Sequence, residues 1–121
     1  HVVKADRVLV CAGKVYWDLI KEAQAKKVQD RVAIIRVEQL YPLDKPGLKA
    51  LHQKYESCKD WRWVQEEPKN MGAWMMMKLN CLDLDIPLAY VGRRAAASPA
   101  TGSYLKHERE QRQLIEESLR F

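Results

Sequence analysis

Two adjacent carboxylates are the most suggestive chemical feature of this 121-residue sequence. Glu66 and Glu67 are of the residue type that paired acid and base catalysis uses, and they end a strand-like run. Neighbouring side chains of a strand point to opposite faces, so the two carboxylates cannot flank one bond. We therefore expect no acid–base pair here. Instead, one of them is expected to cap a helix that begins near Gly72, where the helix dipole favours negative charge.

A glycine and a lysine, Gly13 and Lys14, lie where a strand-like segment gives way to a helical one. A phosphate loop would need an earlier glycine and a Ser or Thr after the lysine, but Val15 occupies that position. A dinucleotide fingerprint would need three glycines, and one is present. Gly13 is therefore expected to form a tight turn. Lys14 is kept as a candidate anion contact at a helix N-terminus.

An arginine pair and a histidine complete the set of candidate site residues. Arg93 and Arg94 precede Ser98, and together they could bind an anion by bidentate pairing or hold a partner carboxylate across an interface. His107 lies on the expected inner face of the last helix without a nucleophile motif. We expect it to be a core or interface histidine.

Cysteine and histidine are too widely spaced for a metal site. The sequence has no Cys-x-x-Cys pair, and its histidines do not follow a zinc-ligand pattern. The residues concerned are Cys11, Cys58 and Cys81, and His1, His52 and His107. We expect free thiols, a reducing compartment and no bound metal.

Composition is typical of one small globular domain. The chain is 47% hydrophobic, carries a net charge of +5 and has no apolar stretch near the ~18 residues that span a membrane. Its basic excess is spread along the chain and mixed with acidic residues, which argues against a nucleic-acid partner. We expect residues 1–6 to be a linker from a missing upstream part and residues 7–121 to be the domain.

Strand-like and helix-like patterns alternate along the whole chain. Apolar, β-branched runs predict strands over residues 7–12, 32–37, 61–66 and 88–91. Apolar residues at helical spacing predict a helix after each strand, over residues 14–27, from residue 44, over about 72–82, and from residue 103. Four such units in a row predict a three-layer α/β/α fold with a mostly parallel sheet. Ligands of such folds bind beyond the carboxyl ends of the strands.

The ends of these elements carry their own signals. Asp44 and Ser103 are expected to cap helices, with Pro46 in the first turn after Asp44. Pro68 is expected to stop the third strand, and Asn70 to cap the helix that follows. The inner face of the last helix is expected to comprise Tyr104, His107, Gln111, Leu114, Ile115 and Leu119. Trp74 and the methionines at 75–77 are expected to form the packed side of a short helix, with too many in a row for all to be core.

Four long motifs occur in order and cover nearly the whole chain from Arg7 onward. They span residues 8–19, 32–42, 65–74 and 92–102, the last followed by His107. Together they resemble the C-terminal domain of the first component of 2-oxoglutarate dehydrogenase, a transketolase-C-like domain. Arg94, where the family often has Pro, and the methionines at 75–77 depart from its pattern. Close relatives that act on 2-oxoadipate, and multifunctional 2-oxoglutarate decarboxylases, share much of it.

The resemblance implies a part of an oxidoreductase. The family's enzyme uses thiamine diphosphate and magnesium to decarboxylate 2-oxoglutarate oxidatively in the tricarboxylic acid cycle, and it succinylates the lipoyl group of the second component. The cofactor binds between two other domains of a homodimer. The implied partners are therefore the upstream domains, a second subunit and the lipoyl-bearing succinyltransferase, and the implied location is a bacterial cytoplasm or a mitochondrial matrix.

For this chain the resemblance implies a structural and dimer-interface role without catalytic, cofactor-binding or metal residues. The fragment alone is expected to be inactive. The motif positions expected to shape contacts are Glu66, Glu67, Asn70, Trp74, Arg93, Ser98 and His107. A small anion- or effector-binding module that uses Lys14, Arg93 and Arg94 remains as an alternative.

Overall fold

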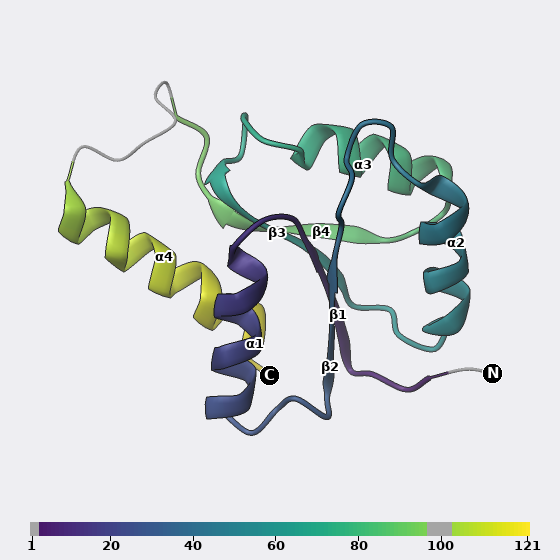
Figure 1. Cartoon of the computed structure of the whole chain (residues 1–121), viewed down its shortest axis with the longest axis horizontal. Helices are drawn as coiled ribbons and strands as arrows, with labels where there is room; N and C mark the ends of the chain where they lie inside the picture. The colour runs from purple at the N-terminus through teal and green to yellow at the C-terminus, as the bar shows by residue number, and fades with distance from the viewer. Residues whose placement is uncertain (1–2, 97–102) are drawn as a thin grey trace.

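Four parallel strands form one sheet between two layers of helices (Figure 1). The computed structural model describes residues 3–96 and 103–121. The strands are β1 (Arg7–Cys11), β2 (Val32–Arg36), β3 (Trp61–Pro68) and β4 (Leu88–Arg93), in the order β2-β1-β3-β4. The helices are α1 (Val15–Ala25), α2 (Lys45–Lys54), α3 (Trp74–Asp83) and α4 (Tyr104–Leu119).

The helices cover the two faces of the sheet in pairs. Helices α1 and α4 pack on one face through a buried cluster that includes Leu19 and Leu114, and α2 and α3 pack on the other through a cluster that includes Leu48 and Met77. All neighbouring strands pair in parallel. The three-layer α/β/α fold predicted from the sequence is therefore confirmed.

Strand β1 lies between β2 and β3 in the sheet, and all five of its residues are buried. Val10 pairs with Ile35 of β2 on one side and with Trp63 of β3 on the other. A continuous apolar run of this length suits a strand that has a helix layer on each face. Successive side chains of β1 enter the two clusters alternately, since Val8 and Val10 belong to one cluster and Leu9 to the other.

Two helix starts agree with the predicted capping residues. The Asp44 carboxylate accepts a hydrogen bond of 2.9 Å from the Gly47 amide at the start of α2, which has Pro46 in its first turn. The Ser103 hydroxyl accepts a hydrogen bond of 3.2 Å from the Lys106 amide at the start of α4. Both caps satisfy amide groups that a helix leaves free at its first turn.

The prediction that Pro68 stops the third strand agrees with the structure, since β3 ends at Pro68, although the strand extends two residues beyond its predicted end at Glu66. Pairing between β1 and β3 ends at Cys11 and Val64, so the last part of β3 has only β4 beside it. The register with β4 also shifts between Gln65 and Pro68. A proline lacks the amide donor that a ladder requires, and this irregular, one-sided end of the strand tolerates that loss.

The prediction that Asn70 caps the next helix is wrong. Helix α3 begins at Trp74, and its N-cap position is Ala73, whose side chain makes no capping hydrogen bond. Asn70 lies four residues before the helix and binds the backbone of Ala96 instead. The loop after β3 is therefore shifted by two residues along the chain relative to the sequence pattern, because the strand ends later and the helix begins later than predicted.

The inner face of α4 is shorter than predicted. Leu114, Ile115 and Leu119 are buried as expected. Tyr104, which was expected on that face, is 73% exposed, because the first turn of α4 extends beyond the edge of the sheet (Figure 1). Helical periodicity marks one face of a helix but does not show how much of its length has a partner.

Residues 3–6, within the expected linker, lie along the domain. The Val3 amide donates to the Lys54 carbonyl at 2.8 Å, and the Asp6 amide donates to the Arg31 carbonyl at 2.8 Å.

Candidate functional site

The chain order of the strands places a candidate site at the carboxyl ends of β1 and β3. From β1 the chain passes through α1 to β2 on one side, and from β3 it passes through α3 to β4 on the other. In open parallel sheets, ligands bind where the direction of the connections reverses in this way. Lys14 follows β1, Glu66 lies near the end of β3 and Arg93 ends β4, so the structure brings three predicted residues to this edge.

Lys14 and Glu66 form an ion pair across the two strand ends. The Lys14 ammonium lies 2.8 Å from Glu66 Oε1, and this hydrogen bond to Glu66 raises the pKa of Lys14. The same carboxylate oxygen accepts a hydrogen bond of 2.7 Å from Gln111 of α4, whose amide also reaches Asp18 at 3.3 Å. Glu66 thus joins β3 to α1 and α4. The prediction that Glu66 or Glu67 caps the next helix is wrong, because the N-cap of α3 is Ala73 and neither carboxylate accepts a hydrogen bond from an α3 amide among the described residues.

Arg93 extends this polar cluster to β4. Its side chain is only 8% exposed, and Nη2 donates a hydrogen bond to Gln111 Oε1 at 3.1 Å. The same nitrogen lies 3.2 Å from Nδ1 of His107, and Arg93 Nε lies 3.2 Å from the Glu110 carboxylate. We name Lys14, Glu66, Arg93, His107, Glu110 and Gln111 the edge cluster.

Two members of the edge cluster could have been found in the sequence. Sequence analysis assigned no polar role to Glu110 or Gln111. His107, Glu110 and Gln111 stand at positions i, i+3 and i+4, which share one face of a helix. Three polar side chains at this spacing, in a helix expected beside the sheet edge, are the signal in the sequence that points to Glu110 and Gln111.

The candidate anion contacts are only partly brought together. Lys14 and Arg93 meet in the edge cluster, where each faces a carboxylate, so a bound anion would compete with Glu66 and Glu110. Arg94 is exposed and makes no hydrogen bond or ion pair with the described part of the chain. Ser98 lies outside the described residues.

A buried glutamine that sequence analysis did not select organises the loop after β3. Gln65 is 3% exposed, and its Oε1 accepts a hydrogen bond of 2.7 Å from the Trp63 indole. Its Nε2 donates to three backbone carbonyls, those of Glu67, Pro68 and Met71, at 3.2, 2.9 and 2.9 Å. One side chain thereby satisfies four buried or part-buried groups and holds the loop against the sheet.

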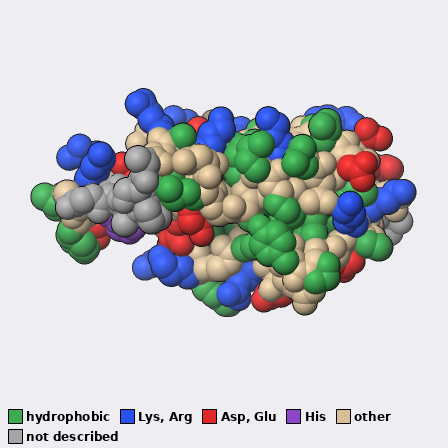
Figure 2. Space-filling view, turned by 90° about the horizontal axis from the view of Figure 1, so that it is seen from above, with side chains coloured by type: hydrophobic (Ala, Val, Ile, Leu, Met, Phe, Trp, Pro, Cys, Tyr) green, Lys and Arg blue, Asp and Glu red, His purple; other side chains and the backbone are tan. Residues whose placement is uncertain are grey.

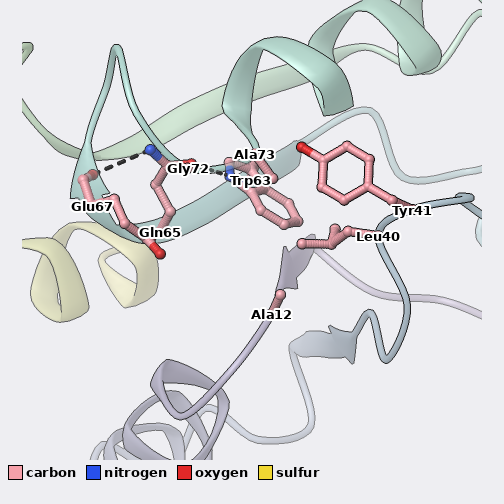
Figure 3. A pocket seen from close by; sticks show the side chains of 8 residues that line it. All are labelled: Ala12, Leu40, Tyr41, Trp63, Gln65, Glu67, Gly72 and Ala73. Atoms are coloured by element: carbon pink, nitrogen blue, oxygen red, sulfur yellow. Dashed lines mark hydrogen bonds between the residues drawn. The ribbon is translucent and has the colours of Figure 1, made fainter.

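A cavity of about 230 Å³ opens on the α2 and α3 side of the same edge (Figure 3). It is lined by Ala12, Leu40, Tyr41, Trp63, Gln65, Glu67, Gly72 and Ala73. Glu67 therefore serves the opposite face of the sheet from Glu66, as the strand geometry predicted. Gly72 has a φ of +67°, and a Cβ there would lie 3.2 Å from both Gln65 and Glu67. The cavity is small, and the hydrogen bonds of its Gln65 carboxamide are already made.

Asn70 and Trp74 have structural roles in the described structure. The Asn70 side chain accepts a hydrogen bond of 2.9 Å from the Ala96 amide and donates one of 2.8 Å to the Ala96 carbonyl, which ties the loop after β3 to the segment after β4. Trp74 is 5% exposed, and its ring lies 5.2 Å from that of Tyr90.

The thiols lack the environment of reactive cysteines. Cys11, Cys58 and Cys81 are all buried and free, as expected from their spacing. Burial raises the pKa of Cys11 to about 12 and that of Cys81 to about 11.

The described residues do not form a metal centre. Within residues 3–96 and 103–121, no group of three or more His, Cys, Asp or Glu side chains could hold a metal ion. No helix in these ranges is long and apolar enough to cross a membrane. The edge cluster is a network of paired charges at the junction of three strands and two helices.

Comparison with known proteins assigns this arrangement to a family. The family model described as 2-oxoglutarate dehydrogenase C-terminal matches residues 2–119. The 2-oxoglutarate dehydrogenase E1 component of Haemophilus influenzae is 44% identical over 118 residues, which are 95% of this chain and 12% of that protein. The proteins of the same name from Coxiella burnetii and Rickettsia felis are 43% and 40% identical, over 96% and 93% of this chain and 13% and 12% of their own lengths. The chain therefore belongs to the 2-oxoglutarate dehydrogenase C-terminal family.

Proposed function

We propose that this chain is the C-terminal domain of a thiamine diphosphate-dependent 2-oxoglutarate dehydrogenase first component. In that enzyme it forms interfaces and contributes no catalytic group. The observation that carries the proposal is the family match over residues 2–119. The bacterial relatives support a bacterial enzyme, and the chain spans only 12–13% of their length. The remaining part of each relative is thus large enough to contain the active site.

The described residues do not fit the cofactor that the family implies. Magnesium in such sites needs several oxygen ligands. Within residues 3–96 and 103–121, no cluster of three or more potential ligand side chains (His, Cys, Asp or Glu) could hold a metal ion. Two of the three candidate cations are also occupied, because Lys14 and Arg93 face carboxylates. We therefore assign thiamine diphosphate, magnesium and the chemistry that the cofactor supplies to other parts of the enzyme.

The edge cluster supports an architectural role. It joins α4 to the ends of β3 and β4 through Glu66 and Arg93, so it sets the position of α4 relative to the sheet. Large apolar side chains remain exposed, among them Trp17 at 60% and Tyr41 at 69%. Such side chains suit contact with the other domains, with a second subunit of a homodimer or with the lipoyl-bearing second component, which are the partners that this function requires.

The second candidate, an anion or effector module, has weaker support. Arg94 is exposed and lacks an ion pair among the described residues, whereas Lys14 and Arg93 would first have to leave Glu66 and Glu110. A thermal-shift screen with nucleotides and acyl-CoA compounds tests it. Stabilisation that is lost in Arg94→Ala would favour the module, and no stabilisation above buffer would exclude it.

A domain exchange tests the main proposal. We would replace the C-terminal domain of the Haemophilus influenzae E1 component, which is 44% identical to this chain, with residues 1–121. The chimera is expected to decarboxylate 2-oxoglutarate in a ferricyanide-reduction assay, and the isolated chain is expected to show no turnover. The host enzyme with its domain deleted is the control.

Two results would contradict the proposal. One is a chimera that is folded and soluble but has no more activity than the deleted host. The other is turnover by the isolated chain. The assay on 2-oxoadipate in parallel tests whether substrate choice follows the host, as expected if the substrate site lies outside this chain.

A further inference from the structure

Helix α3 carries a stripe of large apolar side chains on its outer side. Met75, Leu79 and Leu82 are 53%, 61% and 71% exposed. They stand at positions i, i+4 and i+7, so they lie on one face of the helix. We call these three residues the α3 outer face. Figure 2 looks onto the molecule from the side where α3 lies in Figure 1, and it shows hydrophobic side chains gathered between Lys and Arg side chains.

The helix is apolar on both sides. Its inner residues Trp74, Met77 and Cys81 are buried against the sheet. A surface helix of a globular domain normally has one apolar and one polar face, whereas α3 has large apolar side chains on both its inner and its outer side, with Lys78, Asn80 and Asp83 as its polar residues. The composition of α3 therefore indicates a second packing partner that lies outside the described residues.

Charged groups border the outer face, and the exposed Lys78 lies beside Met75 and Leu82 on the helix surface. Lys45 and Asp83 form an ion pair of 3.8 Å at the C-terminal end of α3. The Lys78 ammonium lies 5.8 Å from the centre of the Trp74 ring. An apolar centre with a charged border is the usual arrangement of a protein interface.

Other exposed apolar residues do not form a comparable surface. Tyr104 and Leu105 are neighbours on α4 and point in different directions from the helix axis. Trp17 stands beside Tyr16, with the two rings 5.0 Å apart at an interplanar angle of 82°. Among the exposed large apolar side chains of the described residues, three share one helix face only in the α3 outer face.

We infer that the α3 outer face packs against an apolar surface of another domain of the same enzyme subunit, an inference that rests on the proposed function. The chain spans 12–13% of its relatives, so most of the polypeptide is available to provide the cover. Contacts between domains of one chain bury roughly 600–1,500 Å², which is more than these three side chains offer alone and leaves room for the charged border.

Methionine oxidation tests the inference in the active chimera. Hydrogen peroxide should oxidise Met75 readily in the isolated chain, where it is 53% exposed, and at least ~10-fold more slowly in the chimera if another domain covers it. Met77, which is 0% exposed, is the internal control and should resist oxidation in both proteins. Tandem mass spectrometry separates the two positions.

A pair of substitutions provides an independent readout. Leu79→Gln and Leu82→Gln keep helix propensity and remove the apolar surface. They should lower the thermal midpoint of the chimera and leave that of the isolated chain unchanged or higher. Leu105→Gln is the matched control, since Leu105 is 71% exposed, as is Leu82, and should change neither protein.

The outcomes separate the two proposals. An inactive or unfolded wild-type chimera contradicts the proposed function. An active chimera in which Met75 oxidises as fast as in the isolated chain overturns the α3 inference alone. Protection of Met75 that disappears when the isolated chain or the chimera is diluted to monomers also overturns it, because a second copy would then be the cover.

Discussion

Arg7 donates a hydrogen bond of 2.9 Å to the backbone carbonyl of Ser118, which ties the first strand of the sheet to the last turn of the last helix. The same nitrogen donates to the Arg120 carbonyl at 2.7 Å. Arg7 Nε also forms a 2.8 Å ion pair with Asp60, at the start of β3. The guanidinium is largely buried and lies 4.2 Å from the centre of the Phe121 ring. It therefore connects β1, β3 and α4 at the edge of the sheet opposite the edge cluster.

We expect Arg7→Met to destabilise the domain by about 2–4 kcal/mol. The substitution removes the donor of two carbonyl groups, one of them fully buried, and leaves Asp60 with Arg62 as its remaining cation. Urea denaturation followed by tryptophan fluorescence measures the change.

Arg31→Gln is the matched control. Arg31 also lies over the Phe121 ring, at 4.1 Å, and forms a 2.7 Å ion pair with Asp6, but both partners of that pair are more than half exposed. Its loss should cost no more than about 1 kcal/mol. Equal costs for the two substitutions would contradict the role given to Arg7.

Stability should decline in acid partly through Asp60. Burial opposes ionisation of this carboxyl, but hydrogen bonds from Arg62 and Arg7 outweigh it and lower its pKa. Its contribution is therefore present above the unfolded pKa of about 3.9 and is lost as the pH falls through the lower pKa of the folded state. In Asp60→Asn the loss of stability between about pH 5 and pH 2 should be shallower. Parallel profiles for the two proteins would show that Asp60 does not contribute.

The folded domain should protect its thiols. Burial raises the pKa of Cys11 to about 12 and that of Cys81 to about 11, so neither forms a thiolate near neutral pH. Ellman's reagent at about pH 8 should react with none of the three buried cysteines in native protein and with all of them in denaturant. Stability should also fall as the pH rises above about 9, because unfolded thiols ionise first. Rapid native labelling of Cys11 or Cys81 would contradict this environment.

Gln65→Leu should cost about 2–4 kcal/mol, because it leaves the Trp63 indole and several carbonyls without their buried partner. The same change at Gln39, which makes one exposed hydrogen bond to the Pro42 carbonyl, should cost less than about 1 kcal/mol. Urea midpoints for both variants provide the comparison. A Gln65 variant as stable as the Gln39 variant would show that the loop after β3 is held by other contacts.

The sequence predicts the fold well because the signals that determine it are local. Apolar runs such as that of β1 and helical stripes such as Leu114 and Ile115 record burial directly, and Asp44 and Ser103 cap the helices that immediately follow them. The opposite orientation of Glu66 and Glu67 follows from strand geometry in the same way.

The features that sequence analysis missed depend on contacts between distant segments. Asn70 binds Ala96, Gln111 binds Glu66, and Arg7 binds Ser118, and local periodicity contains no information about such pairs. Strand β3 extends beyond its predicted end at Glu66 to Pro68, in a part where only β4 lies beside it. The exposure of Tyr104 depends on where the sheet ends, which the helical pattern of α4 does not record.

Calorimetry with thiamine diphosphate and magnesium tests the central claim, that the chain is an interface domain whose enzyme holds its cofactor elsewhere. Titration of the cofactor with magnesium into residues 1–121 should give no binding heat, and titration into the Haemophilus influenzae chimera should give saturable binding, as in the intact host enzyme. Saturable binding by the isolated chain would contradict the account.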